Sequence, residues 1–151
     1  MLKSVCHTKA FEVDAAITTL FPLFSPEGEK RWVPGWEYEN IMGTTELSEG
    51  YVFLTRTHDH GASDAIWIVK KFDPQEHLVQ FYKIEPDEKI GVITVRCTEL
   101  EADRTRVQVT YKYIALSASA ETFVARFSES EYARFIGEWQ TLLAEYLKSI
   151  G

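Results

Sequence analysis

The chain has 151 residues, of which 45% are hydrophobic and 26% charged, a composition that excludes intrinsic disorder and predicts one domain over residues 1–151. Sixteen lysines and arginines against 23 aspartates and glutamates give a net charge of −7 without a basic stripe in the sequence, which argues against nucleic acid as a partner. No run of 18 apolar residues occurs, so we expect no membrane-spanning helix.

The N-terminal part predicts a strand over 4–13 and then two short helices. Asp14 is a candidate N-cap for a helix over 15–23, where apolar residues recur at helical spacing. Ser25 and Pro26 together indicate a second helix start, because proline costs nothing at the first helical position. A Pro-Gly pair at 34–35 ends this helix in a turn.

From residue 36 to 116 short strands alternate with turn residues. Every connection is too short for a parallel crossover, which needs a dozen or more residues, so the sheet is expected to be an antiparallel meander. Together with strand 4–13 it makes a seven-stranded sheet. The meander strands are predicted at 36–42, 51–57, 65–72, 78–84, 90–99 and 105–116.

The C-terminal part predicts one long helix. Ser128 and Glu131 fit a capping box, in which each side chain binds a backbone amide near the other residue. Apolar residues between Tyr132 and Ile150 then fall on one helical face. Strands followed by a helix indicate an α+β protein whose helix packs on one face of the sheet.

Pairing the strands by the shortest closure at each turn divides the side chains between two faces. The assumed closures are 42 with 51, 57 with 65, 72 with 78, 84 with 90, and 99 with 105. The inner face is aromatic and has a few polar tips. From this face and the long helix we predict ligand-binding residues: Trp36, Tyr38, Asn40, Phe53, Thr55, Trp67, Phe81, Val95, Val109, Tyr111, Tyr113, Phe135 and Trp139.

The outer face of strands 65–72 and 78–84 is apolar as well. Its residues are Ile66, Ile68, Phe72, Leu78, Tyr82 and Ile84. Such a patch is either covered by another element or serves as an association surface. We predict a homodimer interface or a protein-docking surface at Ile66, Ile68, Tyr82 and Ile84.

Sheet geometry predicts an internal cavity. Seven strands at about 4.8 Å spacing make a sheet roughly 30 Å wide, whereas a helix is only about 10–12 Å across. The sheet must therefore curl around the helix, which leaves a gap. A gap lined by aromatic residues with a few polar groups is typical of a small-molecule site.

Several segments carry a resemblance to a known family. They are LFPL at 20–23, RWVPGWE at 31–37, GYVF at 50–53, IWIV at 66–69, FDP at 72–74, YIALS at 113–117 and the W-x-x-LL-x-x-YL pattern at 139–147. They resemble the SRPBCC, or START-like, superfamily, and most of all its uncharacterised bacterial branch similar to polyketide cyclases and dehydrases. The resemblance implies the helix-grip fold of the birch pollen allergen, with a curved antiparallel sheet gripping a C-terminal helix around a hydrophobic cavity.

Members of that superfamily bind lipids, sterols, polyketides or plant hormones, and a few are cyclases or hydrolases, but no catalytic set matches here. The resemblance therefore implies a binding protein for a lipid, polyketide or aromatic metabolite, held in a cavity between sheet and helix. A cyclase or dehydratase is the first alternative and needs an inward titratable group, for which tyrosines and His7 qualify. A protein-interaction module without a ligand is the second alternative.

Two other motifs are better explained by structural roles than by metal binding or catalysis. His58, Asp59 and His60 bring two imidazoles together but no third ligand, so we expect a solvated loop and no metal or cofactor. Cys97 faces inward and needs a base such as His7 to act as a nucleophile, so we expect a buried, inert thiol. Because Cys6 and Cys97 are far apart and the only cysteines, they are typical of reduced thiols in a cytoplasmic protein.

Overall fold

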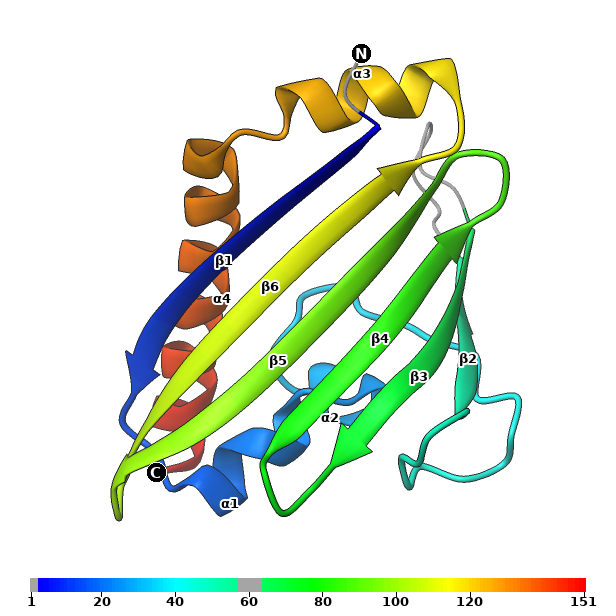
Figure 1. Cartoon of the computed structure of the whole chain (residues 1–151). Coiled ribbons are helices and arrows are strands. Elements are labelled where there is room, and N and C mark those ends of the chain that lie inside the picture. Colours follow the sequence, from blue (N-terminus) through cyan, green and yellow to red (C-terminus); the bar gives the residue numbers. More distant parts are fainter. Residues whose placement is uncertain (1–2, 57–63) are drawn as a thin grey trace.

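In a computed structural model, which describes residues 3–56 and 64–151, a curved antiparallel sheet lies against one side of a long C-terminal helix (Figure 1). The sheet has six strands in the order β1-β6-β5-β4-β3-β2, so the first strand lies beside the last. The strands are β1 (Ser4–Val13), β2 (Val52–Thr55), β3 (Ala65–Asp73), β4 (Leu78–Glu85), β5 (Lys89–Glu101) and β6 (Arg104–Ala115).

Five helical segments complete the fold within the described residues. They are α1 (Ile17–Leu20), the 3-10 helix η1 (Phe21–Leu23), α2 (Pro26–Glu29), α3 (Ala118–Arg126) and α4 (Glu129–Ile150). The Ser128 hydroxyl accepts a hydrogen bond from the Glu131 amide, which confirms the N-cap predicted for the long helix. The Asp14 cap is wrong, because α1 begins at Ile17 behind Ala16, which makes no side-chain cap bond. Among the described residues, no helix is both long and apolar enough to cross a membrane.

The predicted strand over 36–42 does not form, which is why the sheet has six strands and not seven. Among the described residues, a single isolated β-bridge, between Glu39 and Leu54, pairs the backbone of this segment with the sheet. Its side chains pack on Phe53 and Trp67 of the sheet and are also tied to α2: the Trp36 indole donates to the Pro26 carbonyl, and the Tyr38 hydroxyl donates to the Glu27 carboxylate. These bonds hold the segment beside the helix and leave β2 as the edge strand.

The predicted register holds through the β4–β5 and β5–β6 turns, but the predicted closure of 72 with 78 is wrong, because Leu78 pairs with Asp73. Ile84 pairs with Ile90, and Glu99 with Thr105, as the shortest closures predicted. Between Val69 and Lys71 the pairing with β4 shifts by one residue. A bulge reverses the faces beyond it. Phe72 is therefore not on the outer face as predicted; it stacks on Phe21 of the core with ring centroids 6.0 Å apart.

The long helix is attached to the sheet by a buried line of contacts. Tyr132, Ile136 and Leu143 are almost completely inaccessible to solvent and face the sheet. The Tyr132 hydroxyl donates to the Val109 carbonyl on β6, which fixes the first turns of α4 against that strand. Leu78 pairs with Arg96 and so lies on the outer face as predicted, although only 7% of its surface is exposed.

The hydrogen bond of Tyr132 predicts a specific loss of stability. Tyr132→Phe leaves the Val109 carbonyl without this donor, so we expect the free energy of unfolding to fall by about 1–2 kcal/mol. Urea denaturation followed by tryptophan fluorescence measures it. Tyr146→Phe, on the same helix and half-buried with no hydroxyl hydrogen bond among the described residues, is the control and should change little. Equal effects of the two changes contradict the assignment.

Candidate functional site

A small enclosed cavity lies between the sheet, α2 and α4. Its volume is about 20 Å³, room for roughly one water molecule. The ligand-sized internal cavity expected from the strand count is therefore closed in this structure. The cavity is lined by Phe24, Glu29, Phe53, Trp67, Phe81, Ile93, Val95, Tyr111 and Trp139.

Aromatic rings of this lining fill the space that the curved sheet leaves. Phe53 and Trp67 stack with centroids 5.3 Å apart, and Phe81 meets Trp67 edge-on at 6.1 Å. From the helical side, Phe24 stacks on Trp139 at 6.2 Å. Such pairs contribute about 0.5–1.5 kcal/mol each beyond the burial of their area. The interior is therefore closed by side chains rather than by backbone.

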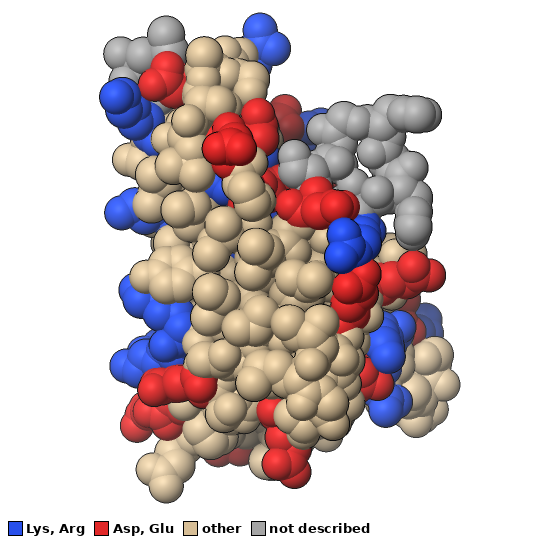
Figure 2. Space-filling view, turned by 90° about the vertical axis from the view of Figure 1, so that its right-hand side faces the viewer, with Lys and Arg blue, Asp and Glu red and all other residues tan. Residues whose placement is uncertain are grey.

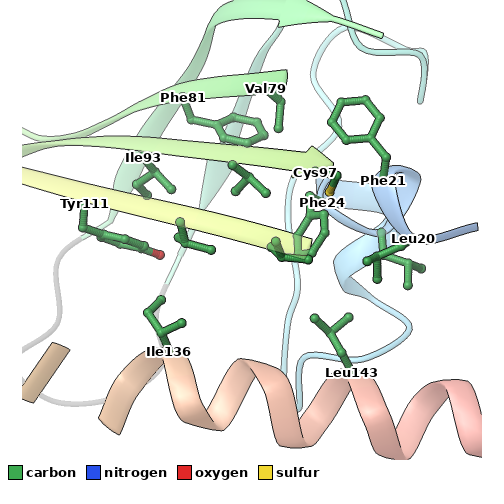
Figure 3. Packing of buried hydrophobic residues seen from close by; sticks show 14 of the residues in the cluster. Leu20, Phe21, Phe24, Val79, Phe81, Ile93, Cys97, Tyr111, Ile136 and Leu143 are labelled. Carbon is green, nitrogen blue, oxygen red and sulfur yellow. The ribbon is translucent and has the colours of Figure 1, made fainter. Parts of the chain in front are cut away.

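Two polar groups point into this aromatic space without a partner. Figure 3 shows the Tyr111 hydroxyl directed into the gap between the sheet and α4. Neither this hydroxyl nor the Glu29 carboxyl makes a side-chain hydrogen bond among the described residues, although both line the cavity. Buried polar groups almost always have partners. The cavity is thus a place where a bound polar group is energetically favoured.

Burial changes the acidity of these groups. Desolvation raises the pKa of Glu29 from 4.5 to about 8, against a smaller opposite effect of the Lys83 charge. Desolvation also raises the pKa of Tyr111 well above its ordinary value, and the Tyr113, Glu29 and Tyr132 groups add to the effect. At neutral pH both cavity groups therefore carry a proton and offer O–H donors.

Lys83 brings a third polar group to the same interior. It lies on β4 between the buried Phe81 and Glu85, on the inner face of the sheet. Its Nζ lies 5.4 Å from the centroid of the Trp67 ring, which lines the cavity. Desolvation lowers the pKa of this amine, although the Glu85 and Glu29 carboxylates act in the opposite direction.

A much larger groove of about 830 Å³ runs beside the cavity, between α4 and the segment that follows α2. It is lined by Trp32, Val33, Pro34, Arg134, Phe135, Gly137, Glu138, Trp139, Thr141, Leu142 and Glu145. Trp139 lines both the groove and the enclosed cavity, so its ring forms the wall between them. It also packs edge-on against Trp32, with centroids 5.5 Å apart.

The structure brings six of the predicted ligand-binding residues together around the cavity. They are Phe53, Trp67, Phe81, Val95, Tyr111 and Trp139. Phe135 lines the groove, and together with Tyr113 it lines a neighbouring hollow of about 380 Å³.

The remaining five predicted residues do not line these spaces. Trp36 and Tyr38 are half-buried and bonded to α2, and Asn40 is exposed and accepts hydrogen bonds from Gly43 and Tyr51. Two others have structural partners: the Thr55 hydroxyl accepts from the Trp67 indole, and the buried Val109 carbonyl accepts from Tyr132.

The sequence analysis did not identify Glu29, Lys83 or Phe24 as residues of the interior. Glu29 ends a four-residue helix, and no periodicity shows which way so short a helix turns its side chains. Lys83 carries a detectable signal, since the predicted alternation on β4 puts it on the same face as Phe81. Phe24 comes from the irregular segment around α2, whose position depends on tertiary contacts alone.

The other candidates in the described part of the chain, Cys97 and His7, do not line the cavity. Cys97 is a free, buried cysteine, as predicted, and burial raises the pKa of its thiol to about 12, which disfavours the thiolate. The His7 ring bonds to the Phe127 carbonyl and stacks on Tyr132 instead. The motif at 58–60 lies outside the described residues. Within 3–56 and 64–151, no three His, Cys, Asp or Glu side chains are grouped to hold a metal ion.

The raised pKa of Glu29 predicts a pH dependence of stability. The folded chain keeps a proton that the unfolded chain loses, so this group lowers stability progressively as pH rises from about 4.5 to about 8. In thermal melts we expect Glu29→Gln to resemble the unmodified protein near pH 4 and to melt higher at pH 8. Glu76→Gln, at an exposed turn, is the control. A difference in melting temperature that is the same at both pH values contradicts a buried, protonated Glu29.

Comparison with known proteins identifies the architecture. No protein-family model and no curated protein sequence matches the chain. Norcoclaurine synthase from Thalictrum flavum, in complex with dopamine and hydroxybenzaldehyde, is similar over 94% of this chain and 87% of its own, with 16% identity and a TM-score of 0.66.

Two further solved structures agree with this likeness. The major latex-like protein 151 of Panax ginseng is similar over 95% of this chain and 97% of its own, with 15% identity and a TM-score of 0.70. A hypothetical protein of Helicobacter pylori is similar over 94% of this chain and 87% of its own, with 12% identity and a TM-score of 0.70. The chain therefore has the helix-grip fold, as its resemblance to the SRPBCC superfamily implied.

Proposed function

We propose that the protein binds a small hydrophobic molecule, with an aromatic or acyl body and one polar group, in the interior between the sheet and α4. The observation that carries this proposal is the position of Trp139. Its single side chain separates the 830 Å³ groove from the cavity, into which Tyr111 and Glu29 present donors without a hydrogen-bond partner. The norcoclaurine synthase structure supports it, since that protein of the same fold is in complex with two small aromatic molecules.

In this proposal the ligand enters through the groove and displaces the Trp139 ring. Its apolar body then packs on Phe53, Trp67 and Phe81, at roughly 25 cal/mol for each Å² of apolar surface removed from water. Its polar group accepts hydrogen bonds from Tyr111 and Glu29. A lipid, a polyketide or an aromatic metabolite meets this description.

The proposal predicts that Trp139 controls entry. We expect Trp139→Ala to accelerate ligand association by about tenfold, a decrease of about 1.4 kcal/mol in the barrier, because no ring has to move. Stopped-flow quenching of tryptophan fluorescence by fatty acids, hydrophobic dyes and aromatic polyketides measures the rate.

Gln140→Ala, one residue further on α4, serves as the control, because Gln140 is exposed and its side chain bonds to Glu12 of β1. An unchanged association rate in Trp139→Ala contradicts the proposal that the Trp139 ring controls ligand entry. If no ligand of the panel binds the unmodified protein or alters its melting, the proposed function is wrong.

A second proposal concerns the outer face of the sheet. Cross-strand pairing lines up Leu54, Ile66, Ile84, Ile90 and Ile114, one from each of five neighbouring strands. In the next row Val52, Ile68, Tyr82 and Val92 are aligned in the same way. Figure 2 looks at the β2 edge of the sheet, beside these two rows and not onto them, and uncharged side chains fill most of the centre of that view. The patch itself is defined by the two rows. This patch supports the predicted homodimer, with a second copy as its occupant.

Basic residues border the patch and make the predicted dimerisation dependent on ionic strength. Lys70, Arg96, Arg106 and Lys112 are exposed on the same face, and two copies in contact would bring these charges together. We therefore expect dimerisation to strengthen as salt screens the repulsion.

Light scattering after size exclusion at low and high ionic strength tests the dimer. Ile68→Asp should abolish association, while Gln108→Asp, on the same face of β6 but outside the patch, should not. A monomer at both ionic strengths rejects the homodimer.

For the location of the protein we propose the cytoplasm, because Cys6 and Cys97 are free thiols, as expected in a reducing compartment.

A further inference from the structure

We propose that the hollow between β6, α3 and α4 is a second binding site, and that it takes a small quaternary ammonium compound. The hollow has a volume of about 380 Å³, and its aromatic lining consists of Tyr113, Phe123, Phe127 and Phe135. Sites that hold a complete small molecule measure about 300–1,000 Å³. The hollow is separate from the interior of the proposed function, because it shares no lining residue with the enclosed cavity.

Three rings of the hollow have planes in two perpendicular directions. Phe123 and Phe127 are nearly parallel, with an interplanar angle of 17° and centroids 5.6 Å apart. The Tyr113 ring stands at 90° to Phe123 and at 80° to Phe127, with centroids 5.1 and 5.2 Å away. A compact cation in such a lining contacts aromatic rings on more than one side, which is the arrangement of the aromatic cages that bind quaternary ammonium groups.

Contacts within the protein hold these rings in place. Tyr113 is a buried residue of β6. Phe127 follows the last turn of α3, and its carbonyl oxygen lies 2.7 Å from the His7 Nε2. The Phe135 ring meets Tyr111 edge-on, with centroids 5.4 Å apart. A ligand therefore meets a preformed site, which lowers the entropic cost of binding.

The protein already places a cation on two of these rings. The Lys89 Nζ lies 4.5 Å from the centroid of Phe123 and 6.0 Å from that of Tyr113. Cations within about 6 Å of a ring centroid are attracted by the ring quadrupole. The charge of Lys89 is balanced by Glu85, whose carboxylate oxygen lies 3.2 Å from the Nζ in a largely buried pair. This neutral pair leaves the other rings of the hollow available to a second cation.

The charges at the border of the hollow also favour a cation. Glu131, Arg134 and Glu138 line the hollow together with the rings. Arg134 forms an ion pair with Glu131, whereas Glu138 is exposed and has no ion pair among the residues that the structure describes. The border thus keeps an uncompensated negative charge. The net charge of −7 on the whole chain adds a long-range attraction for cations.

A quaternary ammonium group fits this lining better than a protonated amine. Each N–H of a protonated amine needs a hydrogen-bond acceptor when it leaves water, and an aromatic lining supplies few. A quaternary ammonium group has no N–H, and its methyl groups pack on ring faces while the positive charge interacts with the ring quadrupole. Its charge then lies near Glu138 without a direct hydrogen bond.

A neutral isostere of choline tests the proposal. In this alcohol a tert-butyl group replaces the trimethylammonium group, so that shape is kept and charge is lost. Each compound is titrated into the isotope-labelled full chain and followed by NMR. We expect choline to bind at least about tenfold more tightly than the alcohol. We also expect nuclear Overhauser effects between the choline methyl protons and the ring protons of Tyr113, Phe123 and Phe127.

Two variants and a matched control localise the effect. Phe123→Leu should weaken choline binding by about threefold or more, because one ring is lost at an exposed position where leucine is tolerated. Glu138→Gln should weaken binding mostly at low ionic strength, since salt screens the contribution of an exposed carboxylate. Glu129→Gln, exposed on the same helix but outside the hollow, should leave binding unchanged.

Three outcomes overturn the site. They are binding of the alcohol as tight as that of choline, choline binding without Overhauser effects to the three rings, and no choline binding at millimolar concentration. All three are measured on the unmodified protein and need no variant to fold. Because the interior is tested with other compounds and through Trp139, this site and the proposed function can each fail while the other stands.

Discussion

The packing of aromatic rings between a wide curved sheet and one narrow helix is the constraint on which the structure depends. α4 covers the sheet along a single buried line through Tyr132, Ile136 and Leu143. The remaining width is filled by rings from the segment before α2 and from β2, β3, β4 and β6. Because rings rather than backbone fill this space, the interior closes to about 20 Å³ without a rigid barrier.

That constraint explains why the few polar groups of the apolar interior have shifted pKa values. A carboxyl, a phenol and an amine among the rings cannot be hydrated as they are in water, so each is pushed toward its uncharged form. Keeping such groups unpaired costs stability, as is common where a protein is organised for binding or chemistry. A ligand that satisfies them and replaces the ring of Trp139 would recover part of that cost.

The outer face of the sheet has a different character from the whole chain. The protein is acidic overall, but its exposed strand residues gather basic side chains beside two aliphatic rows. This separation of charge arises because alternate residues of each strand share a face, so that scattered lysines and arginines become neighbours. The cavity and the outer face are thus on opposite sides of one sheet and can be altered independently.

Local patterns in the sequence determined most of the fold. Alternation predicted β1 and β3 to β6, the capping serine predicted the start of α4, and turn closures placed Trp67, Phe81 and Tyr111 on one face. These features depend on residues close in the chain, and hairpin pairing carries them across the sheet.

Only the tertiary structure decided where the irregular segments lie. Hydrogen bonds to α2 removed the expected seventh strand, and one bulge turned Phe72 inward. The same long-range contacts aimed Glu29 at the cavity and set Trp139 between cavity and groove. Short helices and loops have no periodicity to orient their side chains, so their contribution to the site follows from packing against distant parts of the chain.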